Sequence, residues 1–262
     1  MSTLSLAVRD SSTMLRRNLL HLRRYPSLTF FLVGIPVIIL LLFVYVFGGT
    51  LGAGLGPSGD RTDYANYVTP GILLITVATA AQGTAISVAM DMTEGIIARF
   101  RTMAIFRPSV LTGHVLGSLI QTLFSLAVVT AVALLVGFRP TANPVEWLAA
   151  TGVLAMITFA LTWLSVALGM VSDSVETASN LPMPLVLLPF LGSGFVPTDS
   201  MPTPVRLFAD YQPFTPVMET LRGLLFGSGI GANGIIAVAW CVVITVVSFL
   251  WAKALYNRNR AA

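Results

Sequence analysis

The chain alternates long apolar runs with short polar stretches, a pattern typical of helices that cross a membrane. Each of its main apolar runs comes near the roughly 17–25 residues that a helix needs to cross about 30 Å of hydrocarbon. We therefore predict an all-α membrane protein with six transmembrane helices. The predicted spans are Thr29–Phe47, Thr69–Met90, Val115–Gly137, Trp147–Met170, Leu181–Val196 and Ile235–Ala252.

Three of these regions have features of their own. The first run follows a basic head and, at 19 residues, exceeds the apolar part of a cleaved signal peptide, so we expect an uncleaved signal anchor. The glycine-rich stretch Gly48–Gly59 after it is typical of an outer loop. The fifth run is short and contains Pro182, Pro184 and Pro189. Because each proline removes a backbone N–H, we expect this helix to be kinked or shielded from lipid by its neighbours.

Composition supports the membrane assignment. The 262 residues are 55% apolar and 10% charged, whereas soluble domains carry about 25% charged residues. The net charge of +4 is spread thinly between apolar runs, which argues against nucleic acid as a partner. A single cysteine, Cys241, excludes a disulfide within the chain, and two histidines, His21 and His114, disfavour a histidine-rich metal site.

The distribution of basic residues predicts the orientation. With the N-terminus inside, four basic residues lie in outer segments, namely Arg61, Arg139, Arg206 and Arg222. The other eleven lie in inner segments, and this excess favours two cytoplasmic termini in a multi-pass cell-membrane protein. The inner residues are Arg9, Arg16, Arg17, Arg23, Arg24, Arg99, Arg101, Arg107, Lys253, Arg258 and Arg260.

Residues 1–28 form a cytoplasmic segment whose stretch from Leu4 to Arg24 is amphipathic. Its apolar side chains fall on one face of a helix, which predicts a helix lying along the membrane surface. Such a helix is either a topological anchor or a docking surface for a cytoplasmic partner. The opposite face carries Arg9, Arg16, Arg17, Arg23 and Arg24.

The segment Asp91–His114 connects predicted spans two and three. Large apolar residues alternate with arginines in it, and Glu94 and Arg101, seven positions apart, share a helix face. A short loop in water does not need so many large apolar residues. We predict a short helix lying against a surface, and composition leaves the bilayer and a partner protein as equal alternatives.

Polar and small residues inside spans two and three suggest helix packing more than chemistry. Thr79, Gly83 and Ser87 are spaced by four, as are Ala81, Ala85 and Ala89, which is the spacing of closely packed membrane helices. Gln82 between them needs a partner or a wet cavity, so a substrate-lining role is the alternative. On span three, His114, Ser118 and Gln121 form a polar stripe that we interpret as headgroup contacts, with a proton relay as the alternative.

The stretch Gly192–Gly229 is punctuated by prolines and contains apolar pieces too short to span a membrane. Val217–Phe226, preceded by Thr215-Pro216, is predicted to be a capped helix. We favour short extracellular or re-entrant helices between spans five and six over an ordinary outer loop, because the stretch contains several phenylalanine and leucine residues.

Several functions are excluded or disfavoured by what the sequence lacks. Its only lysine is Lys253, so there is no phosphate-binding loop of the G-x-x-x-x-G-K-[ST] type. The metal-hydrolase motif H-E-x-x-H and the serine-nucleophile motif G-x-S-x-G are also missing. The predicted spans contain no deeply placed carboxylate, which argues against an ion-driven transporter.

Short motifs occur in a fixed order along almost the whole chain. They are Tyr64, Pro70-Gly71, Asp91, Gly95, Arg99-Phe100-Arg101, Gly113, Phe195-Val196-Pro197, Met201-Pro202, Pro213, Thr215 and Arg222. This series resembles the ABC-2-type permeases, most closely the daunorubicin-resistance (antibiotic-exporter) permease family. The chain departs from the family pattern at Ala104, His114 and Gln212, where Pro, Arg and Asn are usual.

The resemblance implies that residues 29–262 form the six-helix transmembrane domain of a half-transporter that exports a hydrophobic drug, antibiotic or lipid-like substrate. Such permeases form dimers, here expected to be homodimers, and bind two copies of a separate ATPase subunit, which holds ATP and Mg. The chain itself would hold no cofactor and do no covalent chemistry. The resemblance makes the amphipathic segment an ATPase contact and the Asp91–His114 segment the coupling helix. Carried over by position, the ATPase-coupling residues are Asp91, Glu94, Gly95, Arg99, Phe100 and Arg101.

Gln82, Thr79 and Phe195 are the candidates for the substrate path. Export of a lipid-linked glycan or lipo-oligosaccharide is the alternative within the same class. An ion-coupled secondary transporter and a membrane-embedded enzyme are the rivals from other classes.

Overall fold

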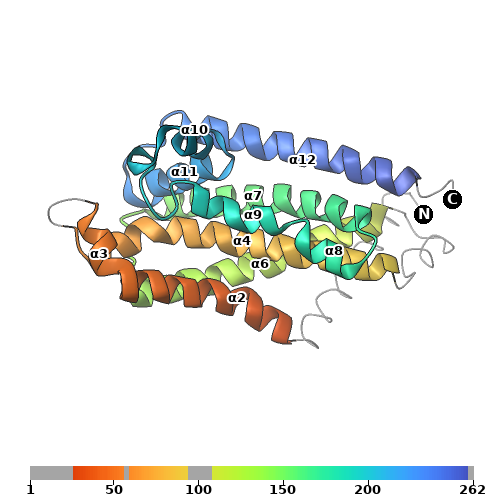
Figure 1. Cartoon of the computed structure of the whole chain (residues 1–262), viewed down its shortest axis with the longest axis horizontal. Coiled ribbons are helices and arrows are strands. Elements are labelled where there is room, and N and C mark those ends of the chain that lie inside the picture. Colours follow the sequence, from red (N-terminus) through yellow and green to blue (C-terminus); the bar gives the residue numbers. More distant parts are fainter. Residues whose placement is uncertain (1–25, 56–58, 94–107, 259–262) are drawn as a thin grey trace.

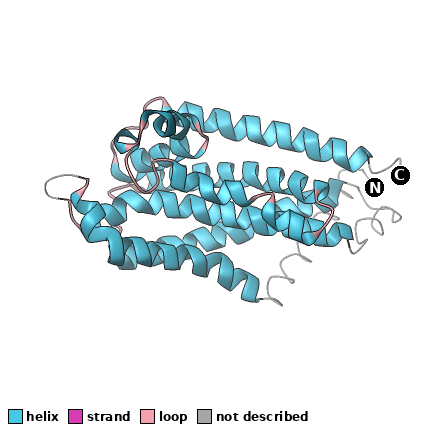
Figure 2. Cartoon of the chain, viewed as in Figure 1, coloured by secondary structure: helices cyan, strands magenta, loops and turns pink. Residues whose placement is uncertain are grey.

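The computed structural model describes residues 26–55, 59–93 and 108–258, and every regular element in these ranges is a helix (Figure 2). Among the described residues, five helices are long and apolar enough to cross a membrane. They coincide with five of the six predicted spans, and the all-helical membrane architecture is confirmed. These helices cover Phe30–Ala53, Arg61–Thr93, Gly113–Val136, Pro144–Val171 and Asn233–Tyr256.

The first of these helices continues where the sequence predicted a loop. It consists of α2 (Pro26–Leu41), a π-helical turn (Leu42–Phe47) and α3 (Gly48–Ala53), so the predicted outer loop Gly48–Gly59 is wrong for its first half. Two of the glycines there, Gly48 and Gly52, allow close packing. A Cβ on Gly48 would lie 2.9 Å from Cγ of Arg61, and a Cβ on Gly52 would overlap the carbonyl oxygen of Asp60.

Helix α4 (Arg61–Thr93) is the centre of the molecule. Its N-terminus is fixed by Asp60, whose Oδ1 accepts hydrogen bonds from the N–H groups of Thr62 and Asp63 at 2.7 and 2.9 Å. This cap starts the helix eight residues before the predicted span. Its 33 residues give a length of about 50 Å, well beyond the hydrocarbon thickness.

The remaining long helices are α6 (Pro108–Val136), α7 (Pro144–Val171) and α12 (Asn233–Arg258). In α7 the Asn143 side chain accepts from the N–H groups of Val145 and Glu146, while the Glu146 carboxylate accepts from the N–H of Asn143. In the most apolar stretches of α4 and α7, 72% and 67% of the residues are buried, against 22–28% in the other three long helices. Helices α4 and α7 thus form the core, and α2, α6 and α12 lie around them (Figure 1).

The fifth predicted span, Leu181–Val196, is not a continuous helix. The chain forms α8 (Val175–Asn180), α9 (Met183–Leu187) and a 3₁₀ turn (Leu188–Leu191), all packed on α4. Pro182 lies between α8 and α9, and Pro184 and Pro189 lie in the first turns of α9 and of the 3₁₀ turn. Each proline removes an N–H group that a continuous helix would need. The count of six continuous spanning helices is therefore not confirmed.

A cap of short helices closes one end of the bundle. After a 3₁₀ turn (Thr198–Ser200), α10 (Thr203–Tyr211) lies over α11 (Phe214–Phe226). The predicted helix Val217–Phe226 is confirmed, but it begins at Phe214 and its N-terminus has no side-chain cap, so the Thr215-Pro216 cap is wrong. Nearly all of α11 is buried, against α4, α7 and α12.

The two ends of the bundle are named here for the orientation predicted from the basic residues. The outer end holds α3, α10 and α11, and the inner end holds the C-terminal ends of α4 and α12 (Figure 1).

Candidate functional site

Arg222 is the centre of a buried polar network at the outer end. Its side chain, 11% exposed, projects from α11. The guanidinium donates to the carbonyl oxygen of Tyr67 at 3.3 and 3.2 Å, to Oγ of Ser193 at 3.2 Å, to the Ser193 carbonyl oxygen and to the Glu219 carboxylate. It also lies 3.9 Å from the centre of the Tyr67 ring. These five hydrogen bonds use all five N–H donors of the arginine. Arg222 therefore holds the surrounding segments together and has no N–H group left for an anion.

A glycine contact brings the segment Gly192–Phe195 directly onto α4. A Cβ on Gly71 would lie 2.8 Å from the carbonyl oxygen of Gly194, closer than real side chains come. About two turns earlier in α4, the hydroxyl of Tyr64 donates to the Phe195 carbonyl at 3.2 Å. The Pro70-Gly71 pair thus lets two backbones approach.

The same segment is held from its other side by the residues before α11. The amide nitrogen of Gln212 donates to the Leu188 carbonyl at 3.1 Å and to Oγ1 of Thr215 at 3.3 Å. A Cβ on Gly192 would overlap the Gln212 amide, so a larger residue there would displace this side chain from its hydrogen bonds. Motifs that are scattered in the sequence therefore meet at one place, which we call the outer junction: Tyr64, Tyr67, Gly71, Gly192, Ser193, Gly194, Phe195, Gln212, Thr215 and Arg222.

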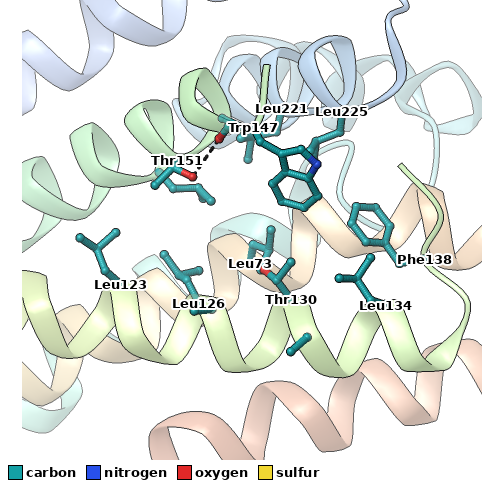
Figure 3. A pocket seen from close by; sticks show the side chains of 14 residues that line it. Leu73, Leu123, Leu126, Thr130, Leu134, Phe138, Trp147, Thr151, Leu221 and Leu225 are labelled. Carbon is teal, nitrogen blue, oxygen red and sulfur yellow. Dashed lines mark hydrogen bonds between the residues drawn. The ribbon is translucent and has the colours of Figure 1, made fainter. Parts of the chain in front are cut away.

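An apolar cavity of about 410 Å³ lies beside this junction, between α4, α6, α7 and α11. Figure 3 shows one face of α6 lining it, opposite Trp147 of α7 and two leucines of α11. None of its lining residues is charged. The polar groups are the Thr130 hydroxyl, the Trp147 indole and the Thr151 hydroxyl, which donates to the Trp147 carbonyl at 2.8 Å. The lining residues include Leu73, Leu123, Leu126, Leu134, Phe138, Leu221 and Leu225.

Two polar pairs join α4 to α6 toward the inner end. Nε2 of His114 lies 2.9 Å from Oδ2 of Asp91, and the hydroxyls of Thr84 and Ser118 are 2.5 Å apart. His114 is 4% exposed. The sequence singled out His114, Ser118 and Asp91 but not their pairing, because a contact between two helices whose partners lie more than 20 residues apart has no local signal.

Comparison with known proteins defines the family. The ABC-2 type transporter family matches residues 10–226. The chain belongs to the ABC-2 type transporter family. It is 28% identical over 256 residues, 97% of this chain and 88% of the relative, to the daunorubicin resistance ABC transporter permease protein DrrB1 of Streptomyces coeruleorubidus. It is 23% identical over 180 residues to the probable doxorubicin resistance ABC transporter permease protein DrrC of Mycobacterium tuberculosis, covering 69% of this chain and 65% of that protein.

Membership of the ABC-2 family confirms the resemblance and the assignment as a multi-pass membrane permease. Proteins of this family work with ABC ATPase subunits. Of the predicted ATPase-coupling residues, Asp91 is described and lies in the last turn of α4. The others lie outside the described residues, as does the predicted N-terminal interface helix: Glu94, Gly95, Arg99, Phe100 and Arg101, and Arg9, Arg16, Arg17, Arg23 and Arg24.

The three candidates for the substrate path have partners inside the subunit. Gln82 donates to the Ser179 carbonyl at 2.6 Å, and Thr79 donates to the Ile75 carbonyl within its own helix at 2.8 Å. Phe195 is buried and stacks on Phe190 with ring centres 4.6 Å apart. None of the three lines the apolar cavity, and their role in a substrate path stays a prediction.

The small residues of α4 divide into two faces. Ala81, Ala85 and Ala89 are buried, and a Cβ on Gly169 of α7 would lie 2.6 Å from the Ala85 carbonyl, so this face packs within the subunit. Gly83 and Ser87 are exposed on the surface of the subunit. The predicted close packing is thus an α4–α7 contact for the alanine series.

Proposed function

We propose that this chain is the membrane subunit of an ATP-driven exporter that moves a hydrophobic drug, antibiotic or lipid-like molecule out of the cell. The observation that carries the proposal is the ABC-2 match over residues 10–226. The names of the relatives, which refer to daunorubicin and doxorubicin resistance, support an apolar, drug-like substrate.

The apolar cavity supports the same substrate class. Its volume of about 410 Å³ falls within the range of small-molecule sites, and its lining is leucine, alanine and aromatic with few hydroxyls. A glycan would leave many of its hydroxyls without partners in such a lining, which is costly. We therefore favour the drug-like substrate over the lipid-linked glycan.

The proposed complex contains two permease chains, as a homodimer, and two ATPase subunits that bind ATP and Mg. It lies in the cell membrane with both termini of the permease in the cytoplasm. The broken segment α8–α9 and the following 3₁₀ turn form the fifth of the six crossings, supported by α4. Helices α10 and α11 are the short extracellular or re-entrant helices of this arrangement.

Helix α4 is the element through which ATPase motion would reach the outer end. Its C-terminal turn leads into the proposed coupling residues Glu94, Gly95, Arg99, Phe100 and Arg101, and its N-terminal turns belong to the outer junction. Movement of the ATPase subunits pushes the inner end of α4, and the helix conveys this push to Tyr64 and Gly71. A substrate then crosses only if its affinity differs between the two states of the dimer.

The test is reconstitution of the permease with its ATPase subunit in proteoliposomes, followed by assays of ATP-driven anthracycline transport and substrate-stimulated hydrolysis. The double variant Glu94→Ala, Arg101→Ala should assemble but lose both activities together. Glu176→Ala, an exposed change on α8 near the inner end, serves as the control and should retain both. Transport driven by an ion gradient without ATP would refute the proposal. Stimulation by a lipid-linked glycan but not by anthracycline would favour the alternative substrate, and full transport by the double variant would exclude the coupling role of that pair.

A further inference from the structure

The pair of Asp91 and His114 lies at the two ends of the segment that joins α4 to α6. Asp91 is in the last turn of α4 and His114 is in the second turn of α6, 23 residues further along the chain. Their side chains are 15% and 4% exposed, and Nε2 of the imidazole is 2.9 Å from the carboxylate. The C-terminal end of α4 and the N-terminal end of α6 thus lie side by side.

The surroundings of this pair are apolar. Val115, next to His114, and Val88, one turn before Asp91, belong to a buried cluster that also contains Trp163, Met170 and Tyr256. Water has little access to a histidine that is 4% exposed, so replacing its partner would leave a buried polar group unpaired. The pair is therefore a persistent contact between the two helices.

We propose that the His114–Asp91 hydrogen bond is a positioning element that makes the inner ends of α4 and α6 move as one body when the ATPase subunits push between them. The proposal rests on the proposed coupling function. The last turn of a helix has unsatisfied carbonyl groups and frays at little cost, so a push on a free end would be absorbed by local unwinding. A side-chain hydrogen bond from the last turn of α4 to α6 restrains this unwinding. The displacement of one helix end is then passed on to the other helix.

The geometry also separates this pair from the second polar contact of the same interface. Thr84 and Ser118 lie about two turns deeper along α4, where the helix is continuous on both sides. Breaking that contact does not free a helix end. The two pairs thus provide a matched comparison, because both join α4 to α6 and only one restrains the ends next to the coupling segment.

The test uses two polar replacements of different reach. The amide nitrogen of glutamine can occupy the position of Nε2 of the imidazole, whereas that of asparagine falls short of the Asp91 carboxylate. In the reconstituted complex, His114→Gln should retain transport per ATP hydrolysed within about threefold of wild type, and His114→Asn should lose about tenfold, within the usual range of coupling between sites. Both should assemble with the ATPase and hydrolyse ATP at the basal rate.

Ser118→Ala is the control and should leave transport per ATP unchanged. Equal transport by the Gln and Asn variants, or a loss in Ser118→Ala as large as in His114→Asn, would overturn the proposal while wild-type transport still supported the proposed function. If His114→Asn does not assemble, His114→Ser, which also falls short of the Asp91 carboxylate, replaces it with the same expected loss of about tenfold, and transport equal to that of His114→Gln would overturn the proposal. Absence of ATP-driven transport by the wild-type complex would instead refute the proposed function.

Discussion

Replacing Arg222 by methionine tests whether the outer junction stabilises the fold. Methionine keeps much of the side-chain length but removes every hydrogen bond to Tyr67, Ser193 and Glu219. Breaking a buried ion pair by removing one partner costs about 3–5 kcal/mol. Because the Glu219 side chain is 34% exposed and can regain water, we expect the lower end, about 3 kcal/mol.

The expected loss is measurable as a change in the thermal unfolding temperature of the detergent-purified protein. For a chain of this size about 1 kcal/mol corresponds to roughly 2–4 °C, so Arg222→Met should lower the apparent Tm by about 6–12 °C. Arg222→Lys should fall between this value and wild type, because lysine keeps the charge but lacks the planar fork that contacts two carbonyl groups.

Arg206→Met is the matched control at the same end of the bundle. Arg206 pairs with Asp199 at 2.6 Å and with Asp210 at 3.6 Å, but its side chain is 48% exposed. Exposed ion pairs contribute about 1 kcal/mol or less, so this variant should lose no more than a few degrees. An equal Tm for Arg222→Met and Arg206→Met would show that the buried network contributes nothing beyond a surface pair, and the reasoning would be wrong.

Three further predictions concern packing and orientation. Gly71→Ala should destabilise the protein by about 1–3 kcal/mol, because its Cβ would press on the Gly194 carbonyl, whereas Gly83→Ala, which meets no atom within 4 Å, should be neutral or stabilising; thermal unfolding compares them. Gln82→Met should cost about 1 kcal/mol, because it leaves the Ser179 carbonyl without its donor, whereas Thr79→Val should leave the Tm near wild type; equal Tm values would exclude a supporting role for Gln82. Reporter fusions should place both termini in the cytoplasm, and an external reporter signal at either end would contradict the orientation based on basic residues.

The apolar runs were sufficient to predict the five long helices but not their limits. Hydropathy placed the start of the second span at Thr69, whereas α4 begins at Arg61 because Asp60 caps it and its first turns pack inside the protein. The glycines of Gly48–Ala53 indicated a loop because sequence alone does not distinguish flexible glycines from glycines that allow close packing.

The candidate site was predictable only in its parts. Arg222 was counted among outer basic residues, and nothing local reveals that Tyr67 and Ser193, more than 20 residues away in the sequence, accept its hydrogen bonds. Likewise, Gln82 was identified as a polar group in need of a partner, but the partner is a carbonyl made available by a helix break about 100 residues later. Such pairings depend on how helices cross, which periodicity does not encode.

The broken segment Val175–Leu191 has a consequence for how the protein is made. Its proline breaks leave carbonyl groups that lipid cannot satisfy, so the segment is unfavourable as an isolated membrane helix. The donor for the Ser179 carbonyl is Gln82, which belongs to a helix synthesised much earlier. In the proposed six-crossing arrangement, helix α4 therefore has to be in the membrane, with that face still uncovered, before this segment can leave the insertion machinery. The early helix would then assist the insertion of the later one.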